Sequence, residues 1–155
     1  MNENMRAEEL AYWAAGIDFD GTIGIARTYG KTKLGRRTYH FIRVSISNTK
    51  RLVIDAALRE FGCGSITTTL TRDGWKTRYI WGVTTNDAVD VLKAIMPYLK
   101  LKKEQAKLAI KYHTNKKVYK GRLPGGGYNV TPPEEMQWRE ECYQKMKVLN
   151  KKGVN

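Results

Sequence analysis

Two carboxylates follow an apolar run in the stretch Leu10-Ala-Tyr-Trp-Ala-Ala-Gly-Ile-Asp18-Phe-Asp20-Gly21-Thr-Ile23. The run is rich in small and apolar residues, which is typical of a helix packed against neighbours. Burying an ionised carboxylate without a partner is very costly, so Asp18 and Asp20 need backbone donors or a cation. Gly21 follows them, and glycine commonly ends helices. The pattern predicts a helix that delivers both acids to a helix-to-strand junction.

The charge balance indicates a polyanionic partner. The chain has 28 lysines and arginines against 15 aspartates and glutamates, a formal net charge of +13. An excess of this size favours a nucleic acid or an anionic membrane surface. Because no apolar run approaches the roughly 18 residues needed to span a bilayer, we expect no membrane partner.

The cysteines and the N-terminal residues indicate the compartment. Cys63 and Cys142 are far apart and form no CxxC spacing, which argues against a structural zinc site and favours a reduced environment. Residues 1–6 show no apolar signal-peptide region. We therefore expect an intracellular protein that is not secreted.

Hydrophobic periodicity and turn signals predict one α+β domain over residues 1–155. The expected core, about 7–117, has the order α-β-β-α-β-β-α with a four-stranded antiparallel sheet, and residues 118–155 add a C-terminal loop and helix. The expected helices span 7–18, 50–61, 87–96 and 101–117, with another after Thr131. The expected strands span 22–29, 36–47, 64–72 and 76–83.

Strict alternation in the second predicted strand separates two kinds of side chain. One face carries Arg37, Tyr39 and Arg43, while the other carries residues such as Ile42 and Val44. In the same way, Lys76 and Arg78 share one face of the last strand, opposite Tyr79, Trp81 and Val83. A sheet with one polar, cationic face is open to solvent or to a ligand.

Three segments resemble the LAGLIDADG homing endonucleases. Trp13-Ala-Ala-Gly-Ile-Asp-Phe-Asp-Gly21 lies on the family's signature and matches it at Ala14, Ile17, Asp18, Asp20 and Gly21. Pro97-Tyr-Leu-Lys-Leu-Lys-Lys-Glu-Gln-Ala106 and Ile46-Ser-Asn-Thr-Lys-Arg51 resemble segments of its single-motif, homodimeric subfamily of chloroplast-intron endonucleases. With the predicted order of elements, the resemblance covers nearly the whole chain.

This resemblance implies a metal-dependent DNA endonuclease. Asp20 would bind the divalent metal, with Mg²⁺ expected and Mn²⁺ or Ca²⁺ as alternative occupants. Lys102 falls on the family's active-site lysine. Asn48 falls near its water-positioning polar residue, and Lys50 and Arg51 compete for one basic role. Asp18 is expected to be structural and to accept backbone donors.

The resemblance also implies two subunits. The family's active site uses two such acids, and this chain has one copy of the motif. We therefore expect a homodimer joined through helix 7–18, with Ala14, Ala15 and Asp18 at the interface.

The predicted sheet supplies the candidate DNA contacts, because a two-stranded ribbon fits the major groove. The expected target is a long, near-palindromic site in double-stranded DNA. The alternatives are a non-cleaving protein of the same fold, such as an intron RNA maturase or a regulator, and an unrelated RNA-binding module. The candidate DNA-binding residues are Thr28, Arg37, Tyr39, Arg43, Thr67, Thr69, Lys76 and Arg78.

Overall fold

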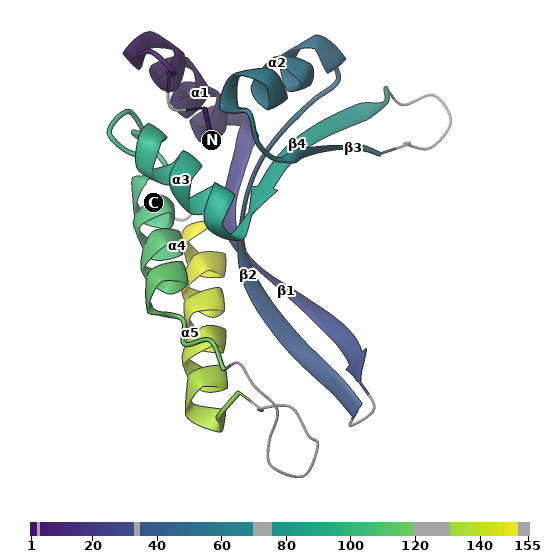
Figure 1. The fold of residues 1–155 in the computed structure, drawn as a ribbon, viewed down its shortest axis with the longest axis vertical. Coiled ribbons are helices and arrows are strands. Elements are labelled where there is room, and N and C mark those ends of the chain that lie inside the picture. Colours follow the sequence, from purple (N-terminus) through teal and green to yellow (C-terminus); the bar gives the residue numbers. More distant parts are fainter. Residues whose placement is uncertain (3, 33–34, 70–75, 120–130, 152–155) are drawn as a thin grey trace.

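The computed structural model describes residues 1–2, 4–32, 35–69, 76–119 and 131–151. The predicted order of elements is confirmed, followed by two further helices (Figure 1). Helix α1 continues two residues beyond the predicted end, so both acids lie in its last turn. The elements are α1 (Ala7–Asp20), β1 (Gly21–Thr32), β2 (Gly35–Asn48), α2 (Arg51–Phe61), β3 (Ser65–Thr69), β4 (Arg78–Thr84), α3 (Thr85–Ile95), α4 (Lys103–Asn115) and α5 (Pro133–Leu149).

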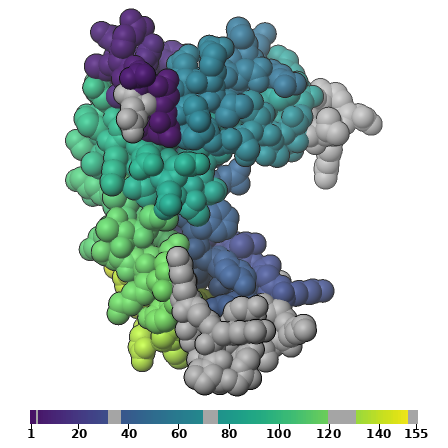
Figure 2. All heavy atoms as spheres, in the orientation of Figure 1, coloured from purple at the N-terminus to yellow at the C-terminus, as the bar shows by residue number. Residues whose placement is uncertain are grey.

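The four strands form one antiparallel sheet in the order β1-β2-β4-β3. Strands β2 and β4 pair in the middle, where Val44 lies opposite Val83, and join the two hairpins. In Figure 1, helices α3, α4 and α5 lie to the left of the sheet, and its two hairpins extend to the right as diverging arms. The molecule is hollowed between these arms (Figure 2).

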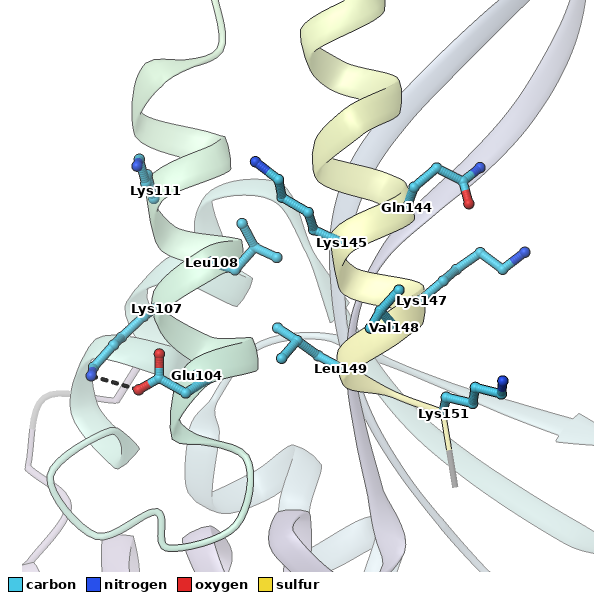
Figure 3. A pocket seen from close by; sticks show the side chains of 10 residues that line it. All are labelled: Glu104, Lys107, Leu108, Lys111, Gln144, Lys145, Lys147, Val148, Leu149 and Lys151. Atoms are coloured by element: carbon cyan, nitrogen blue, oxygen red, sulfur yellow. Dashed lines mark hydrogen bonds and ion pairs between the residues drawn. The ribbon is translucent and has the colours of Figure 1, made fainter. Parts of the chain in front are cut away.

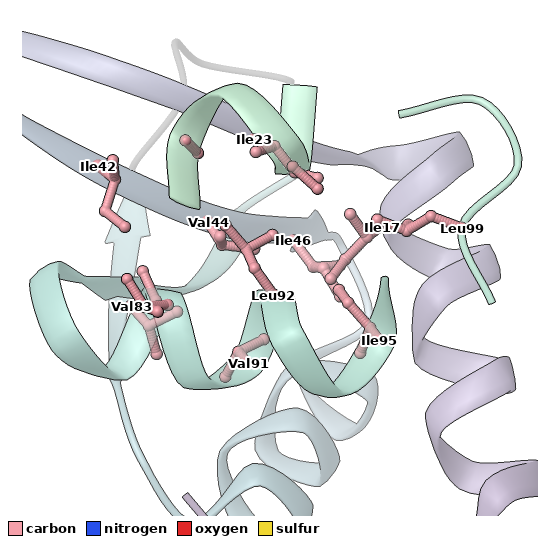
Figure 4. Close-up of a cluster of buried hydrophobic side chains, with 14 of the residues drawn as sticks. Ile17, Ile23, Ile42, Val44, Ile46, Val83, Val91, Leu92, Ile95 and Leu99 are labelled. Carbon is pink, nitrogen blue, oxygen red and sulfur yellow. The ribbon is translucent and has the colours of Figure 1, made fainter. Parts of the chain in front are cut away.

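The core lies between the sheet and the helices (Figure 4). Alternate residues of β1 and β2 point into it, including Ile23 and Val44, and α3 adds Leu92 and Ile95. All four side chains are fully buried, so each contributes about 1.5–3 kcal/mol of transfer free energy. The alternation predicted for β2 is thereby confirmed.

Gly21 joins α1 to β1, but for a different reason from the one predicted. Its φ of −91° and ψ of 176° are extended rather than left-handed. A Cβ atom there would lie 2.6 Å from Cα of Ile17 and 3.0 Å from the carbonyl oxygen of Ser45. Glycine is required because the strand starts against the helix and leaves no room for a side chain.

Helix α5 fixes the β1–β2 arm through Glu140. The Glu140 carboxylate lies 2.8 Å from Nη1 of Arg27 on β1 and 3.0 Å from Nε2 of His40 on β2. The backbone carbonyl of His40 also accepts a hydrogen bond of 3.0 Å from the hydroxyl of Tyr112 on α4. Among the described helices, none is long and apolar enough to cross a membrane.

His40 is expected to make the stability of the protein pH-dependent. Burial lowers the pKa of the His40 imidazole, although its hydrogen bond to Glu140 opposes the shift. As the pH falls below about 6.5, the unfolded chain therefore binds a proton before the folded one does. Between the lowered pKa of folded His40 and a pH of about 6.5, the free energy of unfolding should therefore rise with pH and fall on acidification. Urea unfolding of wild type and His40→Gln at several pH values measures this contribution, and an unchanged slope in the variant would contradict it.

Candidate active site and nucleic-acid interface

Asp20 presents an exposed carboxylate at the end of α1. It forms no hydrogen bond or ion pair with any residue in the described parts of the chain. The C-terminal end of a helix carries a partial negative charge, so this is an unfavourable place for an unpaired carboxylate. Such an arrangement suits a cation that arrives from outside the chain.

Asp18, two residues earlier, is buried and has several partners. Its Oδ2 atom accepts hydrogen bonds from the backbone N–H groups of Lys100 at 2.7 Å and Leu101 at 3.2 Å. Its Oδ1 atom accepts one from the N–H of Lys102 at 2.9 Å. The carboxylate therefore caps the turn that leads into α4, which is the kind of structural role predicted for it.

The side chain of Lys102 binds the backbone at the end of α1. Its Nζ atom donates to the backbone carbonyls of Ile17 at 2.7 Å, Asp18 at 2.8 Å and Gly21 at 2.8 Å. An ammonium has three hydrogens, so all its donors are used on backbone oxygens. Burial lowers the pKa of the Lys102 ammonium from its ordinary value, while the carboxylates of Asp18 and Asp20 oppose that shift.

Asp18 and Lys102 thus form a reciprocal pair of caps, which we call the clasp. Asp18 of α1 binds the backbone before α4, and Lys102 binds the backbone that ends α1. Both sets of contacts bind backbone groups at or next to the helix ends, where the regular hydrogen-bond pattern of a helix stops. The clasp fixes the backbone on either side of Asp20 and leaves the carboxylate of Asp20 open.

The donor chemistry of Asp20 fits a hard divalent cation. Mg²⁺ prefers oxygen ligands, keeps several waters and shares its coordination with substrate phosphates. Within the described residues, no three histidine, cysteine or acidic side chains gather as a metal site. At the end of α1, Asp20 therefore offers a single carboxylate, which is too few ligands to hold a metal ion alone.

Two polar residues, Ser47 and Asn48, end β2, and the role of Asn48 beside the acid stays a prediction. Asn48 shares the face of Ile46, and its Oδ1 atom accepts the N–H of Lys50 at 2.8 Å. Ser47 lies on the other, open face of β2, one position beyond the Gly21–Ile46 pair where β1 begins. Strand alternation extended past Ser45 would have identified Ser47 from the sequence.

The two basic candidates have different surroundings. The Nε atom of Arg51 lies 3.4 Å from the carboxylate of Asp55, and its guanidinium lies 5.8 Å from the ring centroid of Tyr79. Lys50 is exposed and its ammonium contacts no acidic group among the described residues. Neither residue is placed against Asp20 by a direct bond, so their competition for one role stays open.

The sheet gathers the predicted DNA-binding residues on its helix-free face, which lines the hollow (Figures 1 and 2). Thr28 pairs with Tyr39, and Thr69 pairs with Arg78. Arg43 lies beside Gly82, whose missing side chain leaves space for the guanidinium. Arg37 and Thr67 share this face, and the exposed Lys76 precedes β4.

Arg37 and Tyr39 also contact other residues of the chain. A guanidinium nitrogen of Arg37 lies 3.4 Å from the hydroxyl oxygen of Thr131, and its guanidinium is 5.7 Å from the ring centroid of Tyr39. The ring of Tyr39 covers Gly30, where a Cβ atom would lie 2.8 Å from it. These contacts orient Arg37 and Tyr39, whereas DNA binding by any of the eight residues stays a prediction.

The exposed face of α1 differs from the one predicted. Ala14 is fully buried within its own chain, so its side chain offers no exposed surface to a partner. Asp18 is 7% exposed and occupied by its backbone donors. Helical periodicity instead turns Tyr12, Ala15 and Phe19 outward, with Tyr12 63% and Phe19 78% exposed. Of the three predicted interface residues, Ala15 alone lies on this open stripe.

Comparisons with known proteins give matches among solved structures. No protein-family model and no curated protein sequence matches the chain. The homing endonuclease I-CvuI, solved with a DNA target in the presence of magnesium, has a TM-score of 0.70 and 21% identity over 96% of this chain and 86% of that one. The archaeal intron-encoded homing endonuclease I-Vdi141I, complexed with DNA, has a TM-score of 0.69 and 15% identity over 96% and 87%. The DNA-bound meganuclease I-SmaMI has a TM-score of 0.64 and 14% identity, over 96% of this chain and 48% of that one.

Proposed function

We propose that this chain, which has the fold of the homing endonucleases, is a site-specific endonuclease that hydrolyses both strands of duplex DNA. One observation carries the proposal. The exposed Asp20 carboxylate has no described partner, while the clasp of Asp18 and Lys102 fixes the backbone around it. A carboxylate held open in this way contributes nothing evident to folding, so a role in binding a cation explains it best. The cationic face of the sheet provides the surface for the DNA.

Each residue near the end of α1 is assigned one role in the proposed hydrolysis. Asp20 would hold a divalent ion, with Mg²⁺ expected and Mn²⁺ or Ca²⁺ as alternatives, and that ion would supply charge neutralisation and an activated water. Lys102 holds the end of α1 and so positions Asp20. Ser47 faces the open side near the junction and can orient a water, and Lys50 or Arg51 can offset negative charge on the phosphate.

Two subunits are proposed to complete one site. This chain spans about half the length of I-SmaMI, and it carries one Asp20. The outward stripe of Tyr12, Ala15 and Phe19 is an apolar surface of the kind that marks interaction sites. Twofold pairing of this stripe would bring the two Asp20 ends together. A twofold protein reads a near-palindromic site, because each subunit meets an equivalent half.

Replacing Phe19 with aspartate is expected to give a monomer. In a twofold interface, each subunit would contribute one of the new carboxylates, so two negative charges would be buried in the apolar contact. The dissociation constant of the dimer should therefore rise roughly 100-fold or more. Leu52→Asp on α2 is the matched control, because Leu52 is 77% exposed and lies outside the stripe. Sedimentation equilibrium of the three proteins tests this, and a Phe19→Asp protein as dimeric as wild type would refute the interface.

Replacing Arg43 with alanine is expected to weaken target binding about tenfold or more, since a good contact to a base edge is worth about 1–3 kcal/mol. Arg27→Ala removes the same charge from β1, but Arg27 is bound to Glu140 on the helix side. The control should therefore bind DNA with nearly unchanged sequence preference. Binding to a panel of single-base variants of the target distinguishes the two outcomes.

A non-cleaving protein of the same fold, either an intron RNA maturase or a regulator, is the second candidate. The commitment of all three Lys102 donors to backbone carbonyls favours it, because that ammonium has no donor left for a phosphate. We propose an intracellular location, wherever the target genome lies.

Selection from a randomised duplex-DNA library with Mg²⁺ tests the proposal. Wild type should cut a defined near-palindrome, and the Asp20→Asn protein should bind the same sequence without cutting it. If both proteins bind a site and neither cuts it, the second candidate replaces the endonuclease.

A further inference from the structure

A groove of about 1070 Å³ lies between α4 and α5, with the strands behind the two helices (Figure 3). Its floor is aliphatic and consists of Leu108 from α4 together with Val148 and Leu149 from α5. Val148 is 66% exposed and Leu149 is 40% exposed. Two exposed aliphatic side chains beside a third form a small apolar surface, and such surfaces rimmed by polar groups mark interaction sites.

The rim of this groove is strongly basic. Among the described residues that line it, five are lysines and Glu104 is the one acidic side chain. Nζ of Lys107 lies 2.7 Å from the carboxylate of Glu104, so that pair is neutral. The four remaining lysines form no ion pair with any residue in the described ranges. They are Lys111, Lys145, Lys147 and Lys151.

The aliphatic floor and the basic rim together favour one class of anionic partner over others. Single-stranded nucleic acids use aromatic side chains as stacking platforms, and no aromatic side chain from the described part of the chain lines this groove. Contacts to phosphates alone would leave the aliphatic floor in water. An acidic amphipathic helix satisfies both parts, because apolar residues spaced at i, i+3, i+4 and i+7 cover the floor while flanking carboxylates meet the lysines.

We propose that the groove between α4 and α5 binds an acidic amphipathic helix of a partner protein. Leu108 and Val148, in the aliphatic floor, contact the apolar stripe of that helix, and Lys111 and Lys145 pair with its carboxylates. The groove lies on the outer side of the helical layer, whereas the proposed DNA-binding face lines the hollow on the other side (Figures 1 and 3). The two activities are therefore separable.

The test uses a fluorescein-labelled synthetic helix with leucine at i, i+3, i+4 and i+7 and glutamate on both flanking faces. Wild type should bind it saturably in fluorescence polarisation. A scrambled peptide of the same composition should bind with an affinity at least about tenfold lower. Lys145→Glu and Val148→Asp should each lower the affinity about tenfold. Lys93→Glu is the matched control, because it makes the same charge change at an exposed position on α3 and should leave affinity nearly unchanged.

A lysine-flanked version of the peptide should bind the Lys145→Glu protein more tightly than it binds wild type. The absence of saturable binding to wild type would overturn the proposal, as would equal binding of the scrambled peptide. It would also be overturned if Lys145→Glu and Val148→Asp weakened binding of a duplex RNA or an anionic vesicle and left peptide binding unchanged. That result would assign the groove to a nucleic acid or a membrane surface.

Discussion

The Asp20→Asn protein is expected to cleave target DNA about a thousandfold more slowly than wild type, because a metal ligand contributes several kcal/mol of charge stabilisation. Asparagine keeps the shape of the side chain but removes the charge that attracts the cation. Asp20 has no described partner within the chain, so its replacement should not lower the free energy of unfolding. Target binding in the presence of Ca²⁺ and single-turnover cleavage with Mg²⁺ separate recognition from chemistry.

Asp18→Asn is the control that makes this result specific. It is the same chemical change two residues away, but the Asp18 carboxylate accepts three backbone hydrogen bonds at 2.7–3.2 Å. Its replacement should destabilise the protein by about 2–3 kcal/mol, since hydrogen bonds to a charged group are among the stronger ones. We therefore expect Asp20→Asn to lose activity and keep its stability, and Asp18→Asn to lose stability. Equal loss of stability in both variants would mean that Asp20 is also structural.

The Lys102→Met protein is expected to lose about 2–4 kcal/mol of unfolding free energy, because it leaves three carbonyls without their shared donor. The ammonium also lies at the negative end of α1, where a positive charge is favourable. Cleavage should fall as well, since the end of α1 holds Asp20. Urea unfolding measured alongside cleavage at a temperature where the variant is folded tests both effects.

Two further variants separate the clasp from a purely chemical role for the lysine. Lys100→Met alters an exposed lysine of the same turn, and its stability should stay within about 0.5 kcal/mol of wild type. Lys102→Arg keeps the charge, but a planar guanidinium cannot reproduce three donors converging from one nitrogen, so stability should be restored only in part. A Lys102→Met protein as stable as wild type would show that the three hydrogen bonds contribute little.

Local patterns in the sequence predict much of the fold. The alternation along β2 and the turn residues determine which side chains face the core, because strand periodicity depends only on neighbouring residues. The junction after Asp20 and the shared face of Arg43 and Arg78 could therefore be predicted before any coordinates. The same reasoning reaches Ser47 if the alternation is continued by one step.

The rotation of α1 could not be predicted as readily. The helix has apolar or small residues on every side, so periodicity does not identify one buried face. Packing against the sheet and α3 buries Ala14 and Ile17 and leaves Tyr12 and Phe19 outside. The choice of interface residues depends on which face the protomer has already covered, and that is a property of the assembled chain.

The sequence by itself determined the order of elements, the two acids at the end of an apolar helix, and the cationic face of the sheet. The tertiary structure decided the strand order β1-β2-β4-β3 and the roles of Asp18 and Lys102. The hydrogen bonds between Asp18 and the turn at 100–102 join residues 82 to 84 positions apart. Periodicity reports what each residue tends to bury but not which distant group it will meet, so these partners appear only when the chain has folded.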